Sequence, residues 1–283
     1  MTLRETVKNI ENSLTKRYGA GEAKALAGII MEHLKGYSAV DLVLYGDREV
    51  TDFTAGKVSA IVDRLLAGEP IQYIIGSTRW HGLTIKVTPD VLIPRPETSE
   101  LVDLITDRFG NTSDLRVLDL CTGSGCIAVA LARALPFAQV TGVDISDAAL
   151  AVARDNGSAL KVAVKWLKAD VLNLSLTGSY DIIVSNPPYV LESERATMEP
   201  HVLDHEPELA LFVPDDDPLR FYTAILSRAT LLLSGSGRIY FEINPLEAAR
   251  LSSFMKSAGW EDVTVVKDIH GTDRFITALR PQQ

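Results

Sequence analysis

The chain has 283 residues, of which 46% are hydrophobic and 23% are charged, and its formal net charge is −9. This length and composition suit one or two globular domains with a sizeable core. The acidic balance argues against a protein whose main partner is nucleic acid, because such proteins usually carry a basic surface.

Neither the cysteines nor the histidines have the spacing of metal ligands. Cys121 and Cys126 match neither a zinc ribbon nor a redox Cys-x-x-Cys pair, and the five histidines are scattered. We therefore predict no metal site, and two free thiols in a reducing compartment. No apolar run is long enough to cross a bilayer, and the N-terminus lacks a signal-peptide pattern. The expected location is cytoplasmic, with no membrane contact.

Residues 1–70 are predicted to form a small all-helical domain. Apolar residues recur at helical spacing over 3–14, 26–34 and 54–66, with glycines between these segments. The last helix is expected to end at Gly68. Residues 71–93 are then predicted to link two domains as a β-hairpin.

The predicted hairpin has strands at Tyr73–Gly76 and Leu83–Val87, around a turn at Trp80-His81-Gly82. Beyond it, residues 94–283 are predicted to form an α/β domain that begins with a helix over 97–109.

From residue 115 onward strands and helices alternate, which indicates a doubly wound, mostly parallel sheet with helices on both faces. Only a short turn precedes the last strand, whereas a parallel pair needs a crossover of a dozen or more residues. We therefore predict a seven-stranded sheet whose last strand is antiparallel. The predicted strands are 115–120, 139–143, 163–168, 180–185, 237–243, 262–267 and 274–279, and the predicted helices are 125–135, 146–156, 218–233 and 245–258.

A glycine-rich turn, Cys121-Thr122-Gly123-Ser124-Gly125, joins the first of these strands to a helix. Glycines at such a turn let a ligand approach the backbone closely. Asp144 ends the next strand, where an acid can bind a ribose diol, and Asp170 follows the third strand, where it could accept from an adenine amino group. The pattern favours a nucleoside cofactor. It does not by itself exclude NAD, whose fingerprint tolerates Ala128 in the third glycine position, and Asp119 could simply cap the turn.

Asn186-Pro187-Pro188-Tyr189 follows the buried strand 180–185. The prolines cannot donate to a hydrogen-bond ladder, so the chain must leave the sheet as a stiff turn. The turn presents a carboxamide, backbone carbonyls and an aromatic ring at the sheet edge where ligands bind in α/β folds. Such a turn can hold a planar NH2 group, but it does not distinguish glutamine from adenine.

Taken together, these motifs resemble S-adenosylmethionine-dependent methyltransferases that act on planar nitrogens. The resemblance is closest to the protein-(glutamine-N5) methyltransferase family and covers nearly the whole chain. It rests also on Glu69–Gly76, Leu92–Thr98, Glu206–Leu211 and Asp268–Phe275. One departure is His205, where the family often has an aromatic residue. Glu97 and Glu206 could each simply cap or brace a segment.

The resemblance implies a cofactor, a substrate and roles for particular residues. The cofactor is S-adenosyl-L-methionine, with S-adenosyl-L-homocysteine as product, and the substrate is the Gly-Gly-Gln loop of peptide chain release factors. Asn186, Pro187 and Tyr189 are expected to be catalytic, and Pro188 to bind the substrate with them. The expected cofactor-binding residues are Asp119, Cys121, Thr122, Gly123, Ser124, Gly125, Asp144, Asp170 and Asn186.

Three alternatives remain open at this point. The chain could methylate a glutamine in a ribosomal protein, or the N6 amino group of adenine in DNA, because the same turn can hold an extruded base. It could also be a cofactor-binding module without activity, although the intact Asn186 argues against this. We expect the helical domain to contribute to substrate recognition.

Overall fold

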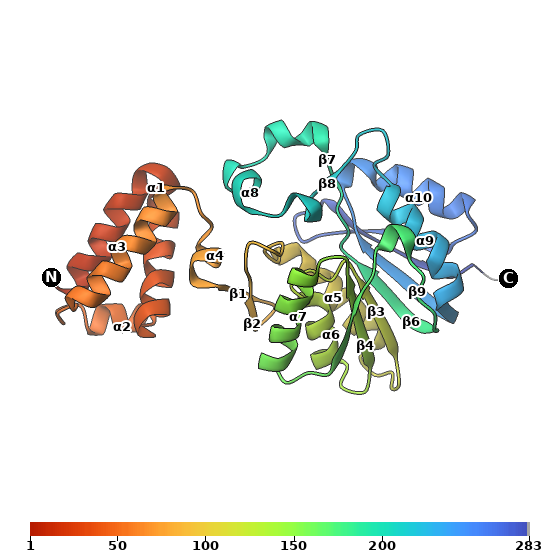
Figure 1. Ribbon diagram of the computed structural model, residues 1–283, viewed down its shortest axis with the longest axis horizontal. Helices are drawn as coiled ribbons and strands as arrows, with labels where there is room; N and C mark the ends of the chain where they lie inside the picture. The colour runs from red at the N-terminus through yellow and green to blue at the C-terminus, as the bar shows by residue number, and fades with distance from the viewer. Residues whose placement is uncertain (282–283) are drawn as a thin grey trace. The chain divides into compact units, whose positions relative to one another are not determined.

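A computed structural model of the protein describes residues 1–281. The chain divides into two compact units, one comprising residues 1–76 and the other beginning at residue 77. Each unit is described separately below, and Figure 1 shows the elements of both.

The N-terminal unit is helical, as predicted. Gly19 breaks the long first helix with a φ of 78°, and Gly36 ends it at a φ of 69°. Thr2 and Glu5 start this helix with a reciprocal capping box. Apolar side chains of the helices pack into a core that belongs to this unit alone. The helices are α1 (Leu3–Lys35), α2 (Ala39–Leu44), α3 (Asp52–Leu66) and α4 (Ile71–Ile75).

The predicted strand at Tyr73–Gly76 is wrong, because these residues lie in and just after helix α4. Pro70 begins the helical turn, and its carbonyl accepts from the N–H groups of Tyr73 and Ile74. Gly76 then ends the turn with a φ of 77°. A short apolar run has no periodicity that separates strand from helix, so the flanking proline and glycine were the better signal.

The hairpin itself exists and lies in the second unit, with its first strand four residues further along than predicted and its second strand beginning at Leu83, as predicted. It pairs β1 (Ser77–Trp80) with β2 (Leu83–Lys86) in antiparallel register. His81 and Gly82 form the connecting turn, both at positive φ. The Nε1–H of Trp80 donates to the carbonyl of Arg95 over 2.8 Å, which attaches the hairpin to the segment that follows.

The second unit contains a seven-stranded sheet in the order β10-β11-β9-β6-β3-β4-β5. All seven strands predicted from the sequence are present in it, with small shifts at their ends. They are β3 (Arg116–Leu120), β4 (Gln139–Asp144), β5 (Val164–Lys168), β6 (Tyr180–Ser185), β9 (Leu233–Glu242), β10 (Glu261–Lys267) and β11 (Asp273–Leu279).

The last strand is antiparallel, as predicted. β11 lies between β9 and β10 and pairs antiparallel with both, whereas β6, β3, β4 and β5 pair in parallel. The chain runs outward from β3 to β5 and then crosses to the other side of β3 to form β6. This reversal is the switch point at which ligands bind in open α/β sheets.

Helices cover both faces of the sheet (Figure 1). Side chains alternate along each strand, so Leu118 and Leu120 pack in a core with Tyr222, Leu226 and other residues of the two C-terminal helices. Asp119 points the other way and meets the N–H of Ala128 in the opposite helix layer. One face carries α5 (Pro96–Phe109), α6 (Cys126–Ala134) and α7 (Asp147–Ala159), and the other carries α9 (Arg220–Leu232) and α10 (Ala248–Ser257).

Residues 190–217 form an excursion after β6 that the sequence patterns did not predict. Its main-chain pairing is short: the parallel pair of β7 (Val190–Leu191) and β8 (Phe212–Val213) brings its two ends together. Between them lie helix α8 (Pro200–His205) and two 3-10 turns, Glu192–Thr197 and Glu208–Ala210. Strands of two residues and single helical turns leave no periodic pattern to read.

Candidate active site

A cavity of about 380 Å³ opens where the parallel strands of the second unit end. Its walls come from the loops after β3, β4, β5 and β6, and from the segments around Arg95 and Pro207. Of the residues predicted to bind cofactor or substrate, Cys121, Thr122, Gly123, Ser124, Asp144, Asp170, Asn186 and Pro188 line it. Asp119, Gly125, Pro187 and Tyr189 lie outside this lining.

The two glycines of the turn differ in what requires them. Gly123 has a φ of 53° and open space where a side chain would project, so a ligand can approach its backbone closely. At Gly125 an added Cβ would lie 2.8 Å from the ring of Trp166 and 2.9 Å from Ala153. Gly125 is therefore required by packing behind the turn. Gly123 lines the cavity, and its lack of a side chain leaves that space open to a ligand.

Asp144 is placed where β4 ends and lines the cavity. Its carboxylate accepts from the N–H of Gly123 over 2.8 Å and from the N–H of Ser146 over 2.9 Å. Burial raises its pKa, although these backbone bonds oppose the shift. A carboxylate has about four acceptor sites, so with three backbone donors the group keeps some acceptor capacity for a ribose hydroxyl.

Asp170 lies at the end of β5 on the same wall. It accepts from the N–H of Leu172 over 2.9 Å and from the side chain of Asn173 over 2.8 Å. Ile145, Val171 and Leu172 add apolar surface beside the two acids. Carboxylates next to apolar side chains suit a nucleoside, which has a polar sugar and a flat base.

Asp119 is fully buried and supports the glycine turn from behind. One carboxylate oxygen accepts from the hydroxyl of Thr122 and from the N–H of Ala128, while the other, Oδ1, has no hydrogen-bond partner among the described residues. Burial raises the pKa of Asp119 to about 7. The interpretation of Asp119 as a residue that shapes the turn fits these contacts, because its side chain is not part of the cavity wall.

Asn186 begins the turn after β6 and lines the cavity. Pro187 and Pro188 are buried, and the preceding Ser185 donates its hydroxyl to the carbonyl of Leu120 over 2.6 Å. These contacts hold the turn against β3. The carboxamide of Asn186 therefore projects from a rigid turn. It lines the same cavity as the glycine turn, although the two segments are far apart in the sequence.

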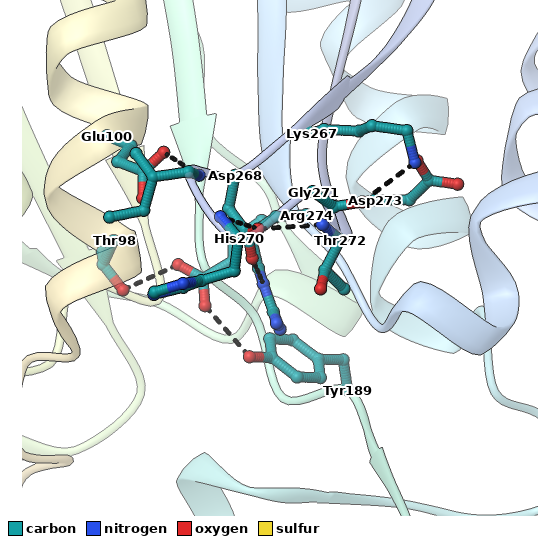
Figure 2. A network of polar contacts seen from close by, with 12 residues as sticks. Thr98, Glu100, Tyr189, Lys267, Asp268, His270, Gly271, Thr272, Asp273 and Arg274 are labelled. Carbon is teal, nitrogen blue, oxygen red and sulfur yellow. Dashed lines mark hydrogen bonds and ion pairs between the residues drawn. The ribbon is translucent and has the colours of Figure 1, made fainter.

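Tyr189 faces a buried carboxylate. Its hydroxyl donates to Oε1 of Glu242 over 3.0 Å, and Oε2 of the same carboxylate accepts from Thr98 over 2.7 Å, as the dashed lines in Figure 2 mark. Burial raises the pKa of Tyr189, and that of Glu242 as well. Stacking of the Tyr189 ring on a substrate amide stays a prediction.

Arg274 and Asp268 complete this network behind Tyr189 (Figure 2). Asp268 accepts from the guanidinium of Arg274 over 3.1 Å and from two N–H groups of its own loop. The positive charge of Arg274 opposes the burial that raises the pKa of Glu242. The segment Asp268–Phe275, which carried part of the family resemblance, thus supports the site from the side of the last strand.

Two residues of the site were missed as functional candidates. Thr98 was quoted only as part of a motif, and Glu242 was noted only as part of the predicted strand 237–243. A signal for Glu242 existed, because an acid within a buried strand needs a polar partner. Nothing in the sequence identified that partner as Thr98, which lies 144 positions away.

Comparisons with known proteins show which family the chain belongs to. The Methyltransferase small domain matches residues 98–203, and the PrmC N-terminal domain matches residues 5–76. A curated protein of Bacteroides thetaiotaomicron, named release factor glutamine methyltransferase, is 46% identical over 96% of this chain and 98% of its own length. The chain belongs to this family.

A Flavobacterium psychrophilum release factor glutamine methyltransferase is 39% identical over 93% of this chain and 94% of its own length. A solved methyltransferase from Pyrococcus furiosus is 18% identical, covers 79% of this chain with all of its own, and has a TM-score of 0.51, which supports the fold alone. As a release factor glutamine methyltransferase family member, the chain is an S-adenosylmethionine-dependent methyltransferase enzyme with the expected fold.

Three further findings concern the part of the chain that the structure describes. Within residues 1–281 no helix is long and apolar enough to span a membrane. The same residues contain no cluster of three or more His, Cys, Asp or Glu side chains that could hold a metal ion. Cys121 and Cys126 are free thiols.

Proposed function

We propose that the enzyme transfers a methyl group from S-adenosylmethionine to the side-chain amide nitrogen, N5, of the glutamine in the Gly-Gly-Gln loop of peptide chain release factors. The observation that carries the proposal is the position of Asn186, a rigidly held carboxamide in the wall of a cavity that also contains the glycine turn and Asp144. The names of the family's members support the choice of substrate.

The residues present fit the cofactor. Gly123 leaves open space beside the backbone, and Asp144 and Asp170 retain acceptor capacity on the cavity wall. These three residues, with the turn around Thr122, are proposed to hold S-adenosylmethionine. When bound, this cofactor supplies a methyl group on a positively charged sulfur, which makes the methyl carbon electrophilic.

The protein's own task is to position a weak nucleophile. The lone pair of an amide nitrogen is delocalised into the carbonyl, so the nitrogen must be held in line and its developing positive charge must be stabilised. The Oδ1 of Asn186 and the carbonyl oxygen of Pro187 are proposed to accept one hydrogen bond each from the two N–H groups of the substrate amide. After methylation one of these protons leaves to water, since the nitrogen has become acidic.

No strong base is needed before the transfer. Among the described residues that line the cavity there is no histidine, and Asp144 and Asp170 are engaged by backbone or side-chain donors. A site built from hydrogen-bond acceptors and a rigid turn suits catalysis by positioning. Positioning can lower the activation free energy by about 7–11 kcal/mol in favourable cases.

The direct test mixes the enzyme, S-adenosylmethionine and intact release factor, followed by mass spectrometry of the Gly-Gly-Gln peptide. We expect a gain of one methyl group on the glutamine. Parallel reactions with ribosomal proteins and duplex DNA distinguish the alternative substrates. Methylation confined to one of these, or none by an enzyme that binds the cofactor, would contradict the proposal. Asn186→Ala should abolish transfer while calorimetry still detects cofactor binding.

We further propose that the N-terminal unit contributes to recognition of the release factor. The unit has its own core, and every residue that lines the cavity belongs to the second unit. Removal of residues 1–76 should therefore raise the KM for release factor and leave the Kd for S-adenosylmethionine unchanged. An unchanged KM for release factor would contradict this role.

A further inference from the structure

Glu242 is the last residue of β9, and its side chain is buried. Each of its two carboxylate oxygens accepts from a hydroxyl group: Oε2 from Thr98 and Oε1 from Tyr189. These hydroxyls come from α5 and from the turn after β6, as Figure 2 shows for the two labelled partners. An ionised carboxylate can only accept, so both hydroxyl protons are committed to Glu242.

This commitment determines what the oxygen of Thr98 can do next. With its proton directed at Glu242, the hydroxyl oxygen has only lone pairs left, and it must accept from any further partner. That partner is the Nδ2 of Asn186, which lies 3.4 Å from Oγ1 of Thr98. The long distance makes this a weak hydrogen bond. Its polarity is nevertheless unambiguous, because Thr98 has no proton to give.

The polarity matters because a carboxamide has one donating and one accepting side. If Nδ2 of Asn186 is directed at Thr98, Oδ1 is directed away from it and is available to a substrate N–H on the cavity wall. The reverse orientation would present an NH2 group to the substrate amide. Two NH2 groups cannot hydrogen-bond to each other, so the reverse orientation could not hold the nucleophile.

Resting on the proposed function, we propose that Glu242 and Thr98 are positioning residues, which orient the Asn186 carboxamide so that its oxygen faces the substrate. The same carboxylate anchors Tyr189, so one buried acid sets both ends of the Asn186–Tyr189 turn. The peptide oxygen of Tyr189 is held as well, by the side chain of Asn244 over 3.1 Å. Glu242 itself does not contact the cavity.

A competing explanation is that Glu242 merely braces α5 against β9. The two explanations differ in what a change of polarity does. A brace needs only a hydrogen bond of either direction, whereas orientation of Asn186 needs a side chain at position 242 that accepts from Thr98 and Tyr189 at once. Glu242→Gln separates them, because its one oxygen should accept from Tyr189, whose phenol is the more acidic hydroxyl, and this leaves the amide nitrogen to donate to Thr98. The Thr98 hydroxyl would then donate to Oδ1 of Asn186 and turn the carboxamide over.

The kinetic experiment measures kcat and KM for release factor, the Kd for S-adenosylmethionine and the Tm of each variant. Glu242→Gln and Thr98→Val should lower kcat by about a hundredfold, as loss of one preorganised hydrogen bond in an active site typically does. Their Kd for the cofactor should stay within about twofold of the wild-type value. Thr98→Ser keeps the hydroxyl and should retain kcat within about threefold.

Thr277→Val is the matched control. Thr277 is a buried threonine of β11 whose hydroxyl oxygen accepts from Arg238 over 3.2 Å, away from the cavity. This variant should have a lower Tm than the wild-type enzyme but the same kcat. A wild-type kcat in Glu242→Gln, a loss of kcat that merely follows a loss of Tm or cofactor binding, or no retention of activity in Thr98→Ser would each overturn the proposal.

A second measurement does not depend on the identity of the substrate. Side-chain amide signals of Asn186 in a ¹⁵N-labelled free enzyme, assigned with Asn186→Asp, report the hydrogen bond of Nδ2. We expect Thr98→Val and Glu242→Gln to shift these signals and Thr98→Ser to leave them nearly unchanged. Unshifted signals in Glu242→Gln would overturn the orientation role even if release factor proves to be the substrate. Shifted signals in an enzyme that ignores release factor would support the role and contradict only the proposed substrate.

Discussion

The guanidinium of Arg95 donates to the carboxylate of Glu206 over 2.6 Å, across 111 positions of the sequence. Glu206 also accepts from the N–H of Ile93 over 3.1 Å, and its side chain is 1% exposed. The segments Leu92–Thr98 and Glu206–Leu211 both carried part of the family resemblance. Hydrogen bonds and an ion pair thus join them beside the cavity. Of the two roles considered for Glu206, the bracing one is what its contacts show.

Removal of Arg95 should therefore cost more stability than neutralisation of Glu206. Arg95→Ala leaves a buried carboxylate with a single N–H donor, and we expect it to lower the free energy of unfolding by about 2–4 kcal/mol. Glu206→Gln keeps one oxygen acceptor for the two donors and leaves no buried negative charge, so it should cost less. Urea denaturation of both single variants and the double variant measures the coupling. A coupling energy near zero would show that the contact does not stabilise the fold.

The ring of Trp166 limits the size of the residue at Gly142. A Cβ at position 142 would lie 2.4 Å from Cζ3 of Trp166, a contact that forces the ring to move. Gly142→Ala should therefore lower the free energy of unfolding by about 1–3 kcal/mol. In a Trp166→Leu background the same substitution should cost little, and an undiminished cost there would exclude the ring as the cause.

Asp119 should make the protein less stable as the pH rises from about 4 to 7. Its pKa is raised to about 7 by burial, against a usual value of 3.8, so the native state binds more protons than the unfolded state in this range. The stabilisation from Asp119 is complete below pH 3.8, the usual pKa of the group, and is lost as the pH rises through the native-state pKa of about 7. The full difference is on the order of 4 kcal/mol.

Asp119→Asn removes this titration, so its stability relative to wild type should increase between pH 4 and pH 7. Chemical denaturation of the ligand-free enzyme across this range gives the comparison. Asp47→Asn is the control, because the side chain of Asp47 is 87% exposed. A stability difference for Asp119→Asn that does not vary with pH would contradict the prediction.

Both cysteines should react slowly in the folded protein. Burial raises the pKa of Cys126 to about 12 and that of Cys121 well above its usual value. The thiolate is the reactive form, so little of it exists at pH 8. Mass spectrometry should find almost no alkylation by iodoacetamide in native enzyme and complete alkylation in urea. Rapid labelling of Cys121 without denaturant would show that its thiolate is accessible.

The sequence alone determined the α/β architecture of the second unit and the location of its glycine turn. Its seven strands follow from local alternation of apolar runs with helical patterns, and the short 268–273 turn decides that the last strand is antiparallel. Glycines and prolines at Gly123 and Pro187 mark backbone turns through local sterics. Signals of this kind depend only on residues close together in the sequence, so they can be recognised without the tertiary structure.

Only the tertiary structure decided how the site is held together. Glu242 meets Thr98, and Thr98 meets Asn186, from three elements that are far apart in the sequence. The orientation of the Asn186 carboxamide depends on where a proton lies in that chain of contacts. Hydrogen bonds between distant side chains are set by the packing of whole elements against one another, and no local pattern of residues records them.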